Sequence, residues 1–81
     1  MITADQIRAA RALLKWSASQ LAAASGVSLP TIQRMESGKG VPNSLARNID
    51  TIQRSLEKAG IEFISENGGG VGVRFKNQDC S

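Results

Sequence analysis

Two short helices joined by a very tight turn are predicted between Ser17 and Gly38. The first ends at Ser25-Gly26, and a new helix start follows at once with Ser28. Gly26 can take the positive φ that so sharp a turn requires, because it has no Cβ to clash with the backbone. The turn therefore predicts that the second of these helices lies across the first, with one face packed and the other turned to solvent.

Helix starts in this chain are marked by capping signals. Thr3–Gln6 (TADQ) and Ser17–Gln20 (SASQ) are both capping boxes, in which a hydroxyl side chain precedes a glutamine by three residues. Ser28 is expected to cap the next helix, with Pro30 in its first turn, where a missing N–H costs nothing. Gly38 is expected to end that helix in the left-handed conformation.

A longer helix and a hairpin are predicted for the rest of the chain. After a loop, apolar residues recur at intervals of four, three, four and three, namely Leu45, Ile49, Ile52, Leu56 and Ala59. Gly60 follows as the C-cap, and the period then changes to two over residues 61–64 and 71–75. We therefore expect a mainly α domain over residues 1–60, a small C-terminal β-hairpin over residues 61–76 and a disordered tail over residues 77–81.

The composition offers little material for catalysis. The 81 residues make one domain with no histidine and a single cysteine, Cys80, next to the C-terminus. Acidic residues are scattered rather than paired, and the Gly-rich stretch 67–70 precedes a strand instead of opening a helix, so it does not predict a phosphate-binding loop. We expect no metal site, no cofactor and no enzymatic activity.

The charge of the chain is compatible with a nucleic-acid partner. Its net charge is +3, which solubility alone would also explain. Four of its basic residues, Arg34, Lys39, Arg47 and Arg54, follow one another in the middle of the chain and could face phosphates. No signal peptide or membrane span is predicted, and the single thiol fits a reducing, cytoplasmic setting.

Four short motifs follow one another in the helical region. They are Leu21-Ala22, Gly26-Val27-Ser28, Thr31-Ile32 and Glu36-Ser37-Gly38. Together they resemble the helix-turn-helix family of phage repressors (the lambda repressor and Cro type, also called XRE-like), over roughly residues 7–56. The resemblance implies a lambda-repressor-like domain of four to five helices that binds double-stranded DNA and regulates transcription. We expect a repressor, because no effector or activation domain is visible.

The resemblance also implies that the helix around residues 29–37 lies in the major groove. Ile32 and Met35 fix its core face, so the residues expected to contact bases are Leu29, Pro30, Thr31, Gln33 and Arg34. Gln33 can bond adenine through two hydrogen bonds, and Arg34 can do the same with guanine. A solvated helix face is the alternative for both side chains.

Phosphate contacts are expected at the edges of this unit, from Ser17, Ser19, Ser28, Ser37, Lys39, Asn43 and Arg47. One position departs from the family pattern, because Ala18 stands where the family often has a phosphate-binding glutamine. The resemblance further implies that Arg11 and Glu36 form an interhelical salt bridge. That pair would build the fold rather than read DNA.

The C-terminal strands leave two interpretations open. They can pack on the fourth helix of their own chain, or pair with the same strands of a second chain in a homodimer, which we favour because one recognition helix touches few bases. Two alternatives to a simple regulator are an antitoxin with a toxin partner and a protein-interaction adaptor on the same fold.

Overall fold

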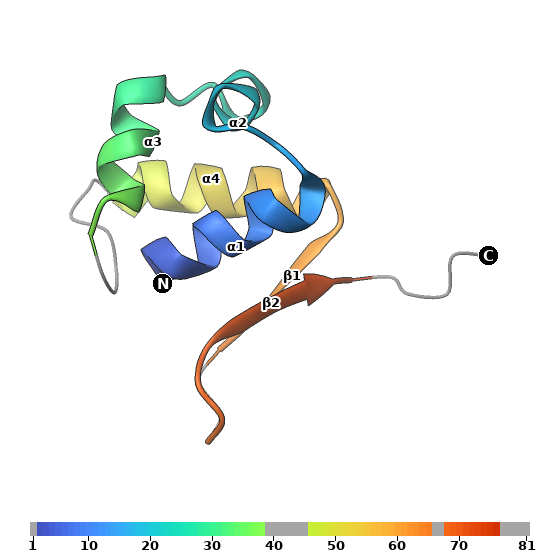
Figure 1. Ribbon diagram of the computed structural model, residues 1–81. Coiled ribbons are helices and arrows are strands. Elements are labelled where there is room, and N and C mark those ends of the chain that lie inside the picture. The colour runs from blue at the N-terminus through green and yellow to red at the C-terminus, as the bar shows by residue number, and fades with distance from the viewer. Residues whose placement is uncertain (1, 39–45, 66–67, 77–81) are drawn as a thin grey trace.

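The computed structural model describes residues 2–38, 46–65 and 68–76. In chain order the elements are α1 (Ala4–Leu14), α2 (Ala18–Ser25), α3 (Leu29–Glu36), α4 (Ala46–Lys58), β1 (Ile61–Ile64) and β2 (Gly72–Phe75). Helices α2 and α3 lie on one side of α1 and α4, and the hairpin lies on the other (Figure 1). The predicted fold class, mainly α with a small C-terminal hairpin, is confirmed. Leu45 and the tail over residues 77–81 lie outside the described residues.

Both predicted capping boxes are present. The Thr3 hydroxyl accepts from the Gln6 amide at 3.1 Å, and the Gln6 Oε1 accepts from the Thr3 amide at 2.8 Å. Ser17 and Gln20 repeat the exchange at 3.1 and 2.7 Å. Two orphan amides are therefore satisfied at the start of each of these helices.

The turn between α2 and α3 is built on Gly26, which caps α2 with a φ of 77°. This is the left-handed conformation that the sequence predicted there. Helix α1 ends in the same conformation without a glycine, since Lys15 has a φ of 58°. A side chain is strained in this region, and the hydrogen bonds from the Lys15 and Trp16 amides to α1 carbonyls hold the backbone in it.

Helix α3 differs from the prediction at both ends. Ser28 occupies the N-cap position, but its hydroxyl caps no amide and lies instead 2.8 Å from the Thr31 Oγ1. The left-handed stop at Gly38 is wrong, because Gly38 has no positive φ. Ser37 ends the helix in right-handed geometry, with both its amide and its hydroxyl donating to the Arg34 carbonyl. That carbonyl is satisfied by Ser37, so no left-handed residue is needed at this point.

The core joins all four helices to the first strand. Its largest side chains, all less than 2% exposed, are Ile7, Leu21, Ile32, Met35, Ile49, Ile52, Leu56 and Ile61. Val27, between α2 and α3, is also buried. The predicted core face of α3, Ile32 and Met35, is therefore confirmed.

The hairpin packs on its own chain. Its strands are antiparallel, with Ile61 opposite Phe75 and Phe63 opposite Val73. Strand β1 contacts α4, β2 contacts α1, and both Phe63 and Val73 pack against the core. The second strand is one residue shorter than predicted. It begins at Gly72, and Val71, which precedes it, is 44% exposed.

A buried glutamine attaches the hairpin to α1. Gln6 is 4% exposed, and its Nε2 donates to the Ile64 carbonyl at 3.2 Å and the Gly72 carbonyl at 3.0 Å. The same side chain completes the capping box with Thr3. One amide thus joins the start of a helix to both strands, a role that the sequence analysis missed.

Candidate nucleic-acid interface

Helix α3 divides into a buried and an exposed side. Ile32 and Met35 are 0% and 1% exposed, and they anchor α3 in the core beside α1 and α2. Pro30, Gln33 and Arg34 are exposed on the other side. The hydrophobic spacing of the helix therefore sets which polar side chains can reach a ligand in solvent.

Two of these exposed side chains are free to bind. Within the described residues, neither the Gln33 amide nor the Arg34 guanidinium has a hydrogen-bond or ion-pair partner. The amide can donate one hydrogen bond to a base edge and accept another, and the guanidinium can donate two. Leu29 and Thr31, half-buried, border this surface.

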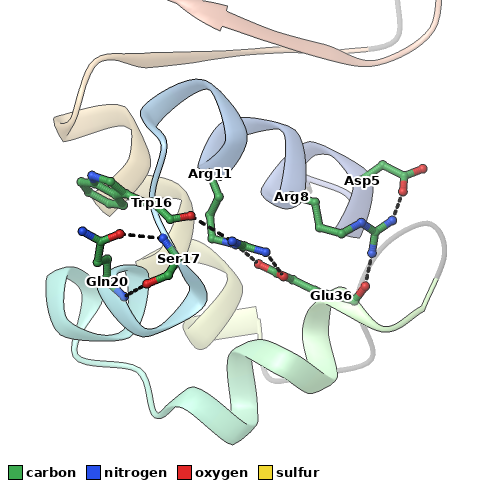
Figure 2. A network of polar contacts seen from close by, with 7 residues as sticks. All are labelled: Asp5, Arg8, Arg11, Trp16, Ser17, Gln20 and Glu36. Atoms are coloured by element: carbon green, nitrogen blue, oxygen red, sulfur yellow. Dashed lines mark hydrogen bonds and ion pairs between the residues drawn. The ribbon is translucent and has the colours of Figure 1, made fainter.

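An ion pair fixes the C-terminal end of α3 to α1 (Figure 2). The Arg11 Nε lies 2.8 Å from the Glu36 Oε2, and the Arg11 Nη2 lies 2.7 Å from the Glu36 Oε1. Arg11 also donates to the Trp16 carbonyl at 3.0 Å. The Glu36 side chain is 10% exposed, so the bonds form largely out of water. The carboxylate raises the pKa of Arg11, chiefly through these hydrogen bonds.

Arg8 adds a second link at the same place. Its guanidinium donates to the Glu36 carbonyl and to the Asp5 carboxylate (Figure 2). The last residue of α3 is thereby held through both its side chain and its backbone. This role of Arg8 was not predicted, although its position three residues before Arg11 places both side chains on the same face of α1.

The N-terminal end of α3 has no side-chain cap, in contrast to α1 and α2. Its first intrahelical bond runs from the Ile32 amide to the Ser28 carbonyl at 3.1 Å. The amides of Leu29 and Thr31 come before Ile32 in the first turn, so they have no carbonyl partner within the helix, and Pro30 has no N–H. Uncapped amides at a helix start form a site for an anion such as phosphate.

Comparison with known families identifies this arrangement. A family model described as helix-turn-helix matches residues 7–45, which include most of α1 together with α2 and α3. Residues 7–45 belong to the helix-turn-helix family, of the phage-repressor type. A comparison with curated proteins finds no match.

This match over residues 7–45 supports a DNA-binding transcriptional regulator. In this family α3 is the recognition helix, so the exposed side of α3 is the candidate DNA surface. The described part of the chain holds no helix long and apolar enough to cross a membrane. It also brings together no group of metal-binding side chains.

The residues expected to bind phosphate differ in their existing hydrogen bonds, and two of them are not described by the structure. Ser17, Ser19 and Ser28 are exposed near the starts of α2 and α3, although the Ser17 hydroxyl already accepts from the Gln20 amide. Ser37 is exposed but donates its hydroxyl hydrogen to a carbonyl of α3. Arg47 is exposed in the first turn of α4. Lys39 and Asn43 lie outside the described residues.

Proposed function

We propose that this helix-turn-helix protein is a sequence-specific repressor that reads the major groove with α3. The exposed pair Gln33 and Arg34 carries the proposal, because both donors are unpartnered on a helix whose other face is fixed in the core. A repressor needs only to occupy its site and exclude other proteins. The buried side of α3 and the ion pair at Glu36 hold the exposed side of the helix in position before DNA binds.

Base recognition would follow from the chemistry of the exposed groups. Gln33 suits adenine, which offers an acceptor and a donor side by side, and Arg34 suits the two acceptors of guanine. Leu29, Pro30 and the Thr31 methyl would contact thymine methyl groups.

Phosphate binding would position this face. Among the described residues, the absence of a side-chain cap on α3 and the exposure of Arg47 support a role for the α3 amides and for Arg47 in this binding. The hydroxyls of Ser17, Ser19, Ser28 and Ser37 would add backbone contacts, as would Lys39 and Asn43. Such contacts fix the register on DNA without selecting a sequence.

We also propose that the protein binds DNA as a homodimer. One eight-residue recognition helix contacts few bases, whereas a two-fold dimer would read two half-sites about 34 Å apart. The C-terminal strands are the proposed interface, because each strand of a two-stranded sheet has a neighbouring strand on one side only and can accept a further strand along its other edge.

The test is selection of bound duplexes from a randomised DNA pool, followed by affinities at two salt concentrations. An enriched inverted repeat with a steep salt dependence is expected. Arg34→Ala should cost about 1–3 kcal/mol on the preferred site and relax the preference at one base position. No enriched sequence and no salt-dependent binding would overturn the proposal and favour the protein-interaction adaptor.

A further inference from the structure

A hollow of about 500 Å³ lies between α2, α4 and the residue that precedes the cap of α2. Trp16 forms one wall, the small side chains of Ala24 and Ala59 form others, and Arg54 and Lys58 line it from α4. Recognition helix α3 contributes no residue to it. Hollows of this size commonly hold small molecules.

The aromatic wall of the hollow faces solvent on one side. Trp16 is partly buried against the core, yet its indole N–H donates to no other residue that the structure describes. Figure 2 shows its ring turned away from the Arg11–Glu36 pair, with only its carbonyl directed toward Arg11. An indole in this position offers a flat apolar face and one free donor at the edge.

The polar side of the hollow is cationic. Arg54 pairs with Asp50 at 3.0 Å, one turn earlier on α4, but Lys58 has no carboxylate partner within the described residues. Arg54 and Lys58 are four residues apart and therefore neighbours on the helix, where like charges repel. The Ser55 hydroxyl, between them in sequence, also lacks a described partner. An anion would satisfy these donors together.

We propose that this hollow binds a small aromatic carboxylate. Its ring would lie against Trp16 between the two alanines, and its carboxylate would meet Lys58 and Arg54. Stacking on the indole favours a flat ring over an aliphatic chain, and the two cations favour a carboxylate over a neutral group. The site is separate from the DNA surface and does not rest on the proposed function.

Benzoate is the probe, because it carries one ring and one carboxylate. Trp16 is the only tryptophan, so its fluorescence reports on the hollow directly. At constant ionic strength, benzoate should give a saturable change in fluorescence and shift the NMR resonance of the indole N–H. Benzamide, which lacks the charge, and acetate, which lacks the ring, should each bind at least about fivefold more weakly.

Lys58→Gln should weaken benzoate binding at least about fivefold, whereas Arg47→Gln, an exposed cation of the same helix outside the hollow, should not. Unchanged thermal unfolding of both variants confirms that they fold. The proposal is overturned if benzoate gives no saturable change, if benzamide or acetate matches it, or if Lys58→Gln leaves it unaltered. Loss of DNA affinity in Lys58→Gln without any benzoate binding would assign these cations to a phosphate contact instead.

Discussion

The contact between α1 and the hairpin depends on the buried side-chain amide of Gln6. The substitution Gln6→Glu should therefore lower the stability of the fold strongly, although it replaces only an NH2 group by an oxygen. The Gln6 Oε1 accepts from the Thr3 amide, and its Nε2 donates to the carbonyls of Ile64 and Gly72. Glutamate preserves the first bond and suits the same position of a capping box. It replaces the Nε2 donor by an oxygen that faces two carbonyl oxygens at a site 4% exposed.

The size of the effect follows from these contacts. Two hydrogen bonds are lost at about 1 kcal/mol each, and a carboxylate is left buried without a cation. We expect the free energy of unfolding to fall by about 3–5 kcal/mol at pH 7. Gln20→Glu is the matched control, because Gln20 holds the same position in the box of α2 but is exposed and bonds only Ser17. Its effect should stay within about 0.5 kcal/mol.

The damage from Gln6→Glu should also depend on pH. Burial beside two carbonyls raises the pKa of the introduced carboxyl in the folded state above its unfolded value. The folded state then binds more protons, so the penalty is smallest below the unfolded pKa and grows as pH rises through the folded pKa. Urea unfolding followed by Trp16 fluorescence at pH 4.5 and pH 7 measures both effects. Equal losses in the two glutamate variants, or a penalty for Gln6→Glu that shrinks as pH rises, would refute the reasoning.

Three further changes test other parts of the fold. Glu36→Gln weakens the ion pair with Arg11, whose side chain is only 22% exposed, and should lower the free energy of unfolding by about 1–3 kcal/mol in urea; an unchanged midpoint would contradict it. Lys15→Gly relieves a φ of 58° and should raise that free energy by up to about 1 kcal/mol, whereas a decrease would show that no strain is stored there. Hydrogen bonds from Arg74 lower the pKa of Glu62, so the stability they add is present above the unfolded pKa and lost as pH falls through the folded pKa. In Arg74→Ala, NMR titration should find the Glu62 pKa raised, and an unchanged value would show that the pair does not form in solution.

The helix starts were predictable because their determinants are local. A hydroxyl and a glutamine three residues apart suffice for the boxes at Thr3 and Ser17, and both form. Local rules also led to the two wrong predictions on α3, the side-chain cap at Ser28 and the left-handed stop at Gly38, because other local hydrogen bonds compete at both positions. A serine hydroxyl can bond several neighbouring groups, and the sequence did not show that Ser28 would contact Thr31 or that Ser37 would bond the Arg34 carbonyl.

Contacts between distant residues were predictable only where a family pattern supplied them. Arg11 and Glu36 are 25 residues apart, and no local rule pairs them, yet the resemblance to phage repressors implied the bond that the structure shows. The second role of Gln6 had no such guide. Its partners lie 58 and 66 residues away on strands whose placement under α1 depends on the whole fold.

The polar residues of α3 fall into those that bond to other elements of the fold and those that we propose to read DNA. Glu36 is fixed by Arg11 and Arg8, while the side chains of Gln33 and Arg34 have no hydrogen-bond or ion-pair partner in the described part of the chain. Loss of Glu36 should therefore lower stability and weaken binding to all DNA sequences alike. Loss of Gln33 or Arg34 should change the sequence preference and leave stability unaltered. Because Arg34 shares no partner with the ion pair, the stability effects of Glu36→Gln and Arg34→Ala should add within about 0.5 kcal/mol. A larger coupling energy in that double-mutant cycle would mean that the ion pair and the reading face are not independent.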